Sequence, residues 1–408
     1  MRILIFILLL LAFDFYAFQA FRNLAQSWQP MFRNLAYGLY WLIPLAFIAW
    51  IGIGVADWND DWSKSTVTLL RTFFFIAYAS KLLVVGVLLV DDLRRLSLYV
   101  YQQFAGDASY RPGRSRFLTQ FGLFLGAIPF FSLLYGIWRN PYRYQLFREQ
   151  VKVPGLPDGL DGLKIVQISD IHTGSFLHKE PVANAVDLIN AQEPDLVFFT
   201  GDLVNNKAEE AQPYVDIFNK IQAKHGVFSV LGNHDYGDYV RWDKEEDKHA
   251  NMELLKDTHR RLGWELLLNE HRTVEVNGEQ VAVLGVENYS AHPRFPKYGD
   301  LQAAHQGTEQ ASLKLLLSHD PSHWEEQIVQ EFQDIALTFS GHTHGMQFGV
   351  EIPGWFKWSP IKYVYKQWAG LYQRGQQYLY VNRGLGYLGY PGRVGILPEV
   401  TLVELRRG

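Results

Sequence analysis

The sequence predicts a helical membrane region followed by a water-soluble α/β domain. Hydrophobic residues make up 48% of the 408 residues and aromatic residues 15%, which is high for a soluble protein. The excess lies in residues 1–140, where long apolar runs recur, whereas residues 150–408 have an ordinary globular composition. In this second part, short β-prone runs alternate with helical or irregular stretches, as in α/β folds. We therefore expect a transmembrane region over 1–140 and a globular domain over 150–408.

Four segments of the first region are long enough to cross a bilayer, whose core takes about 20 apolar residues in a helix. The expected spans are 4–21, 35–56, 66–90 and 117–138. The second and fourth spans carry no charge, but the first contains Asp14 and the third contains Arg71 and Lys81. Ionisable side chains are costly in hydrocarbon. Asp14 and Lys81 should therefore either face the bundle interior, where they could pair, or lie near a helix end or a thinned bilayer and snorkel.

The first span has two interpretations. It is either an uncleaved anchor or a signal peptide cleaved near Ala20, and the large aromatic residues around that site favour the anchor.

Charged residues in the short loops predict the orientation of the spans. The first loop is basic, with Arg22 and Arg33, and so is the third, with Arg94, Arg95, Arg111, Arg114 and Arg116. The second loop is acidic, with Asp57, Asp60 and Asp61 against Lys64. We expect a multi-pass protein of the cytoplasmic (inner) membrane, with both termini and the globular domain on the outer, periplasmic side. Basic residues that follow the last span, from Arg139 to Lys152, weaken this bias.

Composition also narrows the classes of partner and of site. The formal net charge is -4 and no basic stripe dominates residues 150–408, so we expect no nucleic-acid partner. The chain contains no cysteine, which excludes disulfides, iron–sulfur clusters and thiolate metal sites. A metal would have to be held by His, Asp, Glu or Asn.

Five β-prone runs in residues 150–408 each end in side chains that can bind a metal. The runs and the residues that follow them are 163–168 with Asp170 and His172; 196–200 with Asp202; 227–231 with Asn233, His234 and Asp235; 313–317 with His319 and Asp320; and 335–339 with His342 and His344. A lone Asp-x-His or Gly-Asp is more often a solvated strand end or a turn. Ligands in α/β sheets gather at the carboxyl ends of strands, however, so five such endings predict a convergent site.

The spacing inside two motifs has a further expected consequence. In an extended segment residues i and i+2 point to the same side. Asp170 with His172, and His342 with His344, should therefore each project as a pair, and the adjacent glycines let the backbone turn sharply.

The order of these motifs resembles that of the calcineurin-like metallophosphoesterases. Asp-x-His, Gly-Asp, Gly-Asn-His-Asp, His and Gly-His-x-His follow one another in the family's order over residues 150–408. The phrases 162–166, 382–386 and 398–402 also resemble the bacterial membrane-associated branch. Met346 departs from that branch, which often has a second glycine after Gly-His-Thr-His; this change bears on the lip of the site and leaves every ligand in place. The resemblance implies a four-layered αββα sandwich with two metal ions at the strand ends.

The resemblance also implies a role for each motif residue. One ion would be held by Asp170, His172 and His344, the other by Asn233, His319 and His342, and both by Asp202. A bridging carboxylate offsets part of the repulsion between two cations held about 3.5–4 Å apart. The nitrogen and oxygen ligands suit Mn, Fe or Zn without choosing among them.

His234 and Asp235 are the expected catalytic residues. Two such ions activate water near neutral pH and clamp the phosphoryl oxygens. His234 would protonate the leaving oxygen while Asp235 orients the imidazole. Alternatively, His234 is a plain hydrogen-bonding residue beside the ligands.

The implied activity is the hydrolysis of phosphoester bonds, in diesters, monoesters or pyrophosphates, by a membrane-anchored enzyme. Its partners would be the membrane and a phosphorylated small molecule or lipid. The segment 353–372 mixes aromatic residues with Lys357, Lys362 and Lys366, which suits a membrane interface. It would form a lid that admits a lipid-linked phosphate, or else pack on the sheet edge as ordinary core.

A second class of function stays open. The globular domain could be a metal-stabilised binding or sensory module coupled to a four-helix receptor or transport bundle. The complete ligand set together with His234 favours the enzyme, because a module kept for binding has no need of a general acid.

Overall fold

The chain forms two compact units. The computed structural model describes residues 2–56, 62–105, 113–352 and 354–408. The membrane unit comprises Met1–Tyr135 and the globular unit Gly136–Gly408. Four of the residues that predicted the orientation lie outside the described residues: Asp57, Asp60, Asp61 and Arg111.

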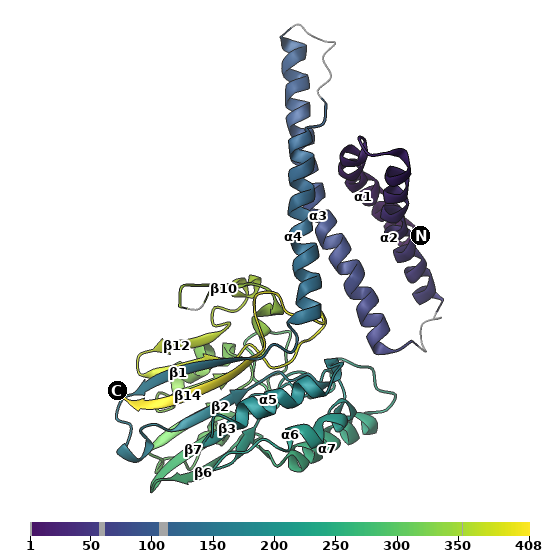
Figure 1. The fold of residues 1–408 in the computed structure, drawn as a ribbon. Coiled ribbons are helices and arrows are strands. Elements are labelled where there is room, and N and C mark those ends of the chain that lie inside the picture. Colours follow the sequence, from purple (N-terminus) through teal and green to yellow (C-terminus); the bar gives the residue numbers. More distant parts are fainter. Residues whose placement is uncertain (1, 57–61, 106–112, 353) are drawn as a thin grey trace. The chain divides into compact units, whose positions relative to one another are not determined.

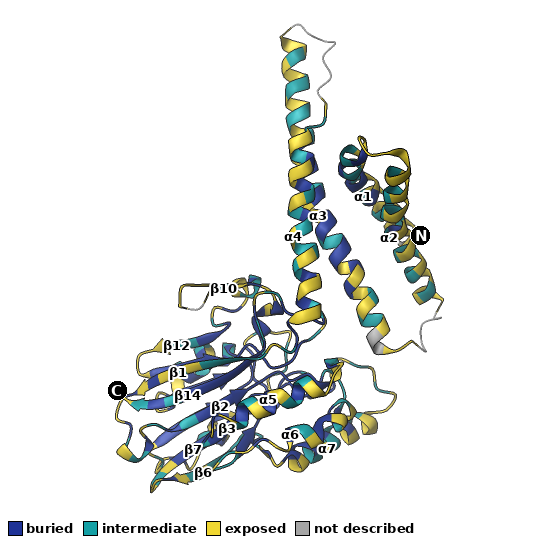
Figure 2. Cartoon of the chain, in the orientation of Figure 1, coloured by how far each residue is buried: buried dark blue, intermediate teal, exposed yellow. Residues whose placement is uncertain are grey.

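The membrane unit is built from four long helices, as predicted. They are α1 (Arg2–Ala25), α2 (Pro30–Val55), α3 (Lys64–Phe104) and α4 (Arg116–Arg139). Each contains a stretch long and apolar enough to cross a membrane. Exposed residues lie along all four helices (Figure 2). Large apolar side chains are among them, including Leu9, Leu39, Leu82 and Phe131. Helices with apolar side chains on their outer surfaces are suited to lipid. Helix α3 continues to Phe104, well beyond the expected end of its span at Val90.

Asp14 and Lys81 form a buried ion pair, which confirms the first of their two interpretations. Lys81 Nζ lies 2.5 Å from Asp14 Oδ1, and Tyr78 donates a hydrogen bond of 2.8 Å to Asp14 Oδ2. Tyr40 donates to the Asp14 backbone carbonyl at 2.7 Å. Both charged side chains are buried. The pair therefore joins α1 to α3 inside the unit, and Lys81 does not snorkel.

The globular unit contains two six-stranded sheets of mixed direction. The first has the order β1 (Gln145–Val153), β14 (Glu399–Arg407), β2 (Lys164–Ile168), β3 (Leu196–Phe199), β4 (Val227–Ser229) and β5 (Glu265–Leu266). The second has the order β12 (Gly370–Arg374), β13 (Gln377–Val381), β9 (Leu337–Ser340), β8 (Leu313–Leu317), β7 (Glu279–Gly285) and β6 (Glu270–Val276). A separate hairpin pairs β10 (Val350–Ile352) with β11 (Phe356–Trp358).

Helices cover the outer faces of the sheets. They are α5 (Glu180–Asn190), α6 (Val215–Phe218), α7 (Glu245–Leu262), α8 (Leu301–His305) and α9 (Val329–Glu331), which follows the π-helical turn η5 (Trp324–Ile328). Figure 1 shows α5, α6 and α7 on one side of the strands. Short 3₁₀ turns are η1 (Asp158–Leu160), η2 (Thr173–Ser175), η3 (Ala208–Glu210), η4 (Gln212–Tyr214), η6 (His344–Gln347) and η7 (Pro360–Tyr363).

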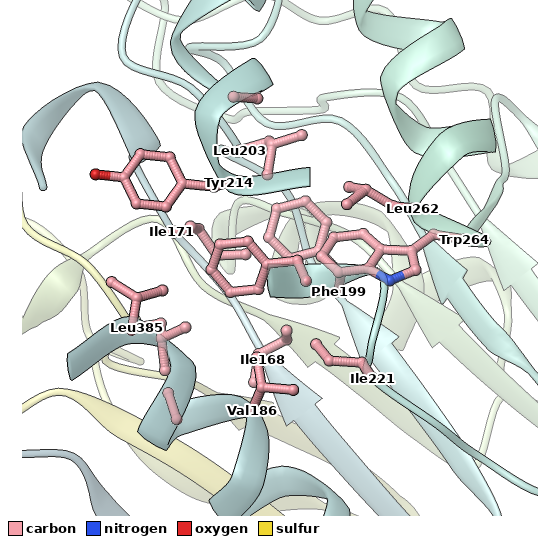
Figure 3. Close-up of a cluster of buried hydrophobic side chains, with 14 of the residues drawn as sticks. Ile168, Ile171, Val186, Phe199, Leu203, Tyr214, Ile221, Leu262, Trp264 and Leu385 are labelled. Carbon is pink, nitrogen blue, oxygen red and sulfur yellow. The ribbon is translucent and has the colours of Figure 1, made fainter. Parts of the chain in front are cut away.

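Three hydrophobic cores separate four layers, so the predicted αββα sandwich is confirmed. One core lies between the first sheet and α5, α6 and α7, where Val186, Phe199 and Trp264 pack together (Figure 3). A second fills the space between the sheets, and a third lies between the second sheet and the turn at Trp324. Strand β2 alternates accordingly, with Ile165 in the central core and Val166 in the outer one, as the period of two in a strand requires.

The strand directions bring the five predicted endings together. Strands β2, β3 and β4 are mutually parallel in the first sheet, and β8 and β9 are parallel in the second. Three endings thus come from one sheet and two from the other.

Candidate metal centre

The backbone at the candidate ligands is turned sharply, which differs from the extended geometry expected for the paired motifs. Five candidate ligands have φ in the left-handed region: Asp170 (49°), His172 (49°), Asp202 (61°), His342 (72°) and His344 (50°). Residues other than glycine adopt this region only when surrounding structure holds them there, and such strain gathers at functional sites. Here the backbone N–H of Asp170 donates to Gly201 O at 2.9 Å and that of His172 to Asp202 O at 3.1 Å. Neighbouring strand ends therefore hold one another in place.

Asp170, His172 and His344 form the first cluster. His172 Nε2 lies 3.0 Å from His344 Nε2, and His344 Nε2 lies 3.2 Å from Asp170 Oδ1. All three side chains are buried, and their ligand atoms lie within 4.8 Å of one another. The structure thus joins a pair from β2 with a single histidine from β9.

Asn233, His319 and His342 form the second cluster. His342 Nδ1 lies 2.8 Å from Asn233 Oδ1 and 3.3 Å from His319 Nε2. His319 Nδ1 contacts the Thr200 carbonyl at 2.7 Å, an arrangement that fixes the ring and leaves Nε2 as the ligand atom. His342 and His344 therefore serve different clusters, although they lie two residues apart.

Asp202 connects the two clusters. Its Oδ2 lies 3.5 Å from His172 Nε2 and 3.2 Å from His319 Nε2. Asp170, Asp202 and His319 also form a group whose ligand atoms lie within 4.8 Å of one another. One carboxylate is thus within reach of both sets of ligands.

The pKa shifts of the buried histidines favour the binding of divalent cations. Burial lowers the pKa of His172 to about 3 and that of His342 to about 4, so both rings are neutral and offer a lone pair, the form that binds metals. Burial opposes the charged form of His319, but the Asp202 carboxylate outweighs it and raises the pKa of His319 to about 10. The space between Asp202 and His319 therefore favours positive charge. Carboxylates, imidazoles and an amide without sulfur suit Mn, Fe or Zn.

Asp235 does not orient the His234 imidazole, which corrects the expected role. Its buried carboxylate accepts backbone N–H bonds from Asp202 (2.8 Å), Leu203 (2.9 Å) and Gly232 (2.9 Å), and burial, followed by the nearby Asp202 charge, raises its pKa to about 7. The His234 ring instead contacts the Asn205 carbonyl through Nδ1 at 2.7 Å. Through these hydrogen bonds the Asp235 carboxylate stabilises the backbone of the loop that carries Asp202.

A buried arginine supports the first cluster from behind, and the sequence did not single it out. Arg393 is fully buried and donates to the carbonyls of Arg383 (2.9 Å) and Gly384 (3.0 Å). Its Nη2 also lies 3.4 Å from His344 Nδ1. A Cβ on Gly386 would lie 1.9 Å from Ile171 O, so this loop can approach the cluster only with glycine there. The glycine-rich phrase 382–386 was the one visible signal.

A pocket of about 560 Å³ opens onto the centre. It is lined by Asp202, Asn233, His234, Tyr239, His292, Arg294, Phe295, His342, Thr343, His344, Ile361, Val364, Tyr365 and Leu388. The loop between β7 and α8, with His292, Arg294 and Phe295, was not anticipated from the sequence, and no motif marks it. Phe295 packs on the His342 ring with centroids 4.7 Å apart. Another pocket, of about 370 Å³ beside Lys207 and Trp242, contains none of the candidate ligands.

The aromatic segment 353–372 is divided between buried and exposed side chains, so its buried part packs as core and the lid stays a prediction. Tyr365 and Trp368 are buried and pack with Ala369 and Ile396. Tyr365 also places its hydroxyl 2.8 Å from His342 Nε2. Trp355 and Tyr363, by contrast, are 80% and 75% exposed. Residue 353 lies outside the described residues.

Comparisons with known proteins agree with this geometry. Residues 163–346 match the sequence model of the family described as "Calcineurin-like phosphoesterase", and residues 1–141 match "Probable Calcineurin-like phosphoesterase, transmembrane domain". The uncharacterised metallophosphoesterase YkuE of Bacillus subtilis is 27% identical over 67% of this chain and 89% of its own length. A "Transmembrane protein with metallophosphoesterase domain" of Danio rerio is 29% identical over 67% of this chain, which spans 60% of that protein.

A third relative matches a longer part of the chain. An uncharacterised metallophosphoesterase of Helicobacter pylori is 29% identical over 76% of this chain and 77% of its own length. The chain belongs to the calcineurin-like metallophosphoesterases, as a member with a transmembrane domain.

Proposed function

We propose that this membrane-associated phosphoesterase hydrolyses its substrate with two divalent ions, one in each cluster. The observation that carries the proposal is the position of Asp202 between His172 and His319, with further ligands on either side. Such ions would supply an activated water and neutralise the phosphoryl oxygens. One site comprises Asp170, His172 and His344, the other Asn233, His319 and His342, and Asp202 is common to both.

His234 is the proposed proton donor. It is half-buried and lines the pocket. Its Nδ1–H is occupied by the Asn205 carbonyl, which leaves Nε2 as the ring atom that can pass a proton to a leaving oxygen. Asp235 is a positioning residue, because it acts through the backbone around Asp202 rather than through His234.

The remaining walls of the pocket support an amphiphilic substrate, such as a lipid-linked phosphate. Arg294 is exposed, and no ion pair joins it to a carboxylate among the described residues. A guanidinium in that position can bind phosphate oxygens in pairs. Phe295, Ile361, Val364 and Leu388 supply apolar surface in the same pocket. The pocket thus offers one cationic contact and one apolar wall.

We also propose where the two parts of the chain work. Residues 1–140 would anchor a multi-pass protein in the cytoplasmic membrane and residues 150–408 would act on its periplasmic side, supported by the basic first and third loops. Because the chain has no cysteine, a single Glu253→Cys on exposed α7 reports the side of the membrane. An impermeant maleimide should label it in cells with a permeabilised outer membrane, and labelling only after lysis would reverse the orientation.

Metal-dependent turnover of the full chain in detergent tests the activity. Protein loaded with Mn²⁺, Fe²⁺ or Zn²⁺ is offered p-nitrophenyl phosphate, bis-p-nitrophenyl phosphate, pyrophosphate and a lipid phosphate. We expect hydrolysis of at least one bond type that stops when a chelator removes the metal. Protein with full metal occupancy that is inert to all four would instead favour the binding or sensory module.

A further inference from the structure

Exposed apolar side chains of the globular unit gather in the short segment 346–364. Among the described residues of 140–408, eight large hydrophobic side chains of this segment are exposed: Met346, Phe348, Val350, Ile352, Trp355, Phe356, Tyr363 and Val364. Elsewhere in that range the exposed ones are Leu177, Tyr239 and Tyr298. We call the eight residues the apolar face. Scattered single exposures are normal on a protein surface, but a concentrated group marks an interaction site.

The hairpin in the middle of this face has an apolar side and a charged side. In the pairing of β10 with β11, Ile352 lies opposite Phe356 and Glu351 lies opposite Lys357. Residues opposite each other share one face of a sheet, and alternate residues share it too. Val350, Ile352 and Phe356 therefore lie on one side and the two charged residues on the other.

The charged side of the hairpin is the one that faces the protein. Glu351 pairs with the buried Arg383 at 2.5 Å, and the Lys357 ammonium donates to the Ala369 carbonyl. The apolar side is left exposed, as most of the hairpin is in Figure 2. A hairpin on a soluble surface normally shows the reverse pattern, with its apolar side inward.

The apolar face continues into the pocket and carries cations. Val364 is 58% exposed and also lines the pocket. Lys362 and Lys366 beside it are exposed, and neither forms an ion pair with a carboxylate in the part of the chain that the structure describes. Exposed aromatic residues flanked by lysines suit the interface of a bilayer that contains anionic lipids. The same chain carries four helices long and apolar enough to span a membrane, which favours a lipid surface over a soluble partner as the occupant of this face.

We propose that the apolar face inserts into the surface of an anionic bilayer, with Trp355, Phe356 and Tyr363 among the acyl chains and Lys362 and Lys366 at the phosphates. The mouth of the pocket, at Val364, then opens at the lipid surface. A lipid phosphate would then reach the metal centre without leaving the membrane. This consequence for the substrate rests on the proposed function.

Single cysteines in the full chain test the docking directly, since the natural sequence has none. Trp355→Cys and Tyr363→Cys are labelled with an environment-sensitive fluorophore, and Glu253→Cys on α7, which is exposed, is the matched control. Each protein is reconstituted in nanodiscs of phosphatidylcholine with or without phosphatidylglycerol, and a lipid carrying a nitroxide on its acyl chain serves as quencher. We expect quenching at both face positions to exceed that at the control several-fold and to rise with phosphatidylglycerol. Lys362→Glu/Lys366→Glu should remove that rise.

Other outcomes overturn the docking. Equal quenching at all three positions would mean that the face does not enter the lipid. Fluorescence that shifts without lipid quenching and grows with protein concentration would assign the face to a second copy of the chain. Hydrolysis of p-nitrophenyl esters in the same samples is read separately. Quenching without any metal-dependent hydrolysis would leave the docking standing and refute the proposed function.

Discussion

The buried ion pair of the membrane unit and the candidate metal centre of the globular unit arrange ionisable side chains in opposite ways. In the membrane unit one acid meets one base: the Asp14 carboxylate accepts from Lys81 on one oxygen and from Tyr78 on the other. In the candidate metal centre, by contrast, side chains of the same type lie next to one another. The Nε2 atoms of His172 and His344 lie 3.0 Å apart, and Asp170 and Asp202 are buried in the same group.

The difference distinguishes a structural cluster from a functional one. A closed pair already balances its charge and its hydrogen bonds, so it needs no ligand, although its loss leaves a buried charge without a partner. Several ring nitrogens and two carboxylates buried side by side offer more ligand atoms than they can satisfy among themselves, which favours an added cation. Substitutions in the two units should therefore fail in different ways, one in folding and the other in metal binding.

The largest effect is expected from Asp202→Ala. Loss of a residue that merely supports a ligand costs about 10–100-fold in metal affinity, so loss of the carboxylate shared by both clusters should cost more and make turnover undetectable. Elemental analysis of the purified protein, alongside hydrolysis of p-nitrophenyl esters, measures both quantities. Asp257→Ala, which removes a partly exposed carboxylate paired with exposed Arg260 on α7, is the control and should keep metal and activity. Equal metal content and equal turnover in the two variants would refute the role of Asp202.

His234→Ala should keep both metals and lose about 10²–10⁴-fold in turnover, the usual contribution of a general acid. The loss should be larger for an alkyl or lipid ester than for a p-nitrophenyl ester, because nitrophenolate leaves without a proton. His249→Ala, on exposed α7, is the control. An equal loss for both leaving groups would identify His234 as a plain hydrogen-bonding residue.

Lys81→Leu should destabilise the membrane unit by about 3–5 kcal/mol, because it leaves Asp14 buried and uncompensated. The double variant Asp14→Leu/Lys81→Leu should recover most of that loss. Unfolding by SDS in mild micelles measures the stability, and turnover of a soluble ester by folded protein should stay unchanged in both variants. A double variant as unstable as the single one would show that the lost stability does not come from the unpaired charge.

The smallest effect is expected from Asp235→Asn. The amide can accept from the backbone N–H groups around Asp202 through one oxygen instead of two. Metal affinity should therefore fall by about 10-fold, which is the low end of the range for a residue that supports a ligand. Turnover at saturating metal should stay near that of the natural protein, since Asp235 does not contact the His234 ring. Titration of activity with Mn²⁺ separates the two quantities. Reduced turnover with unchanged affinity would restore the role first expected for Asp235.

The class of each region and the identity of the candidate ligands can be predicted from local sequence patterns. Four apolar stretches predicted four helices because hydropathy over about 20 residues is a local property. Five β-prone runs with polar endings predicted the strand ends, and the order of Asp170, Asp202, Asn233, His319 and His342 carried the family resemblance. These signals lie within a few neighbouring residues, so they can be read without knowledge of the fold.

The atoms that each of these side chains contacts depend on how distant segments pack. Lys81 and Asp14 are 67 residues apart in the chain, so the sequence left open whether they pair. His172 and His344 are 172 apart, and only the family resemblance, not a local pattern, placed them together. The left-handed backbone at the ligands, the contact of His234 with Asn205 and the inward turn of Glu351 likewise depend on distant segments. Local sequence sets what a side chain can do, whereas long-range packing sets the atoms it faces and hence its function.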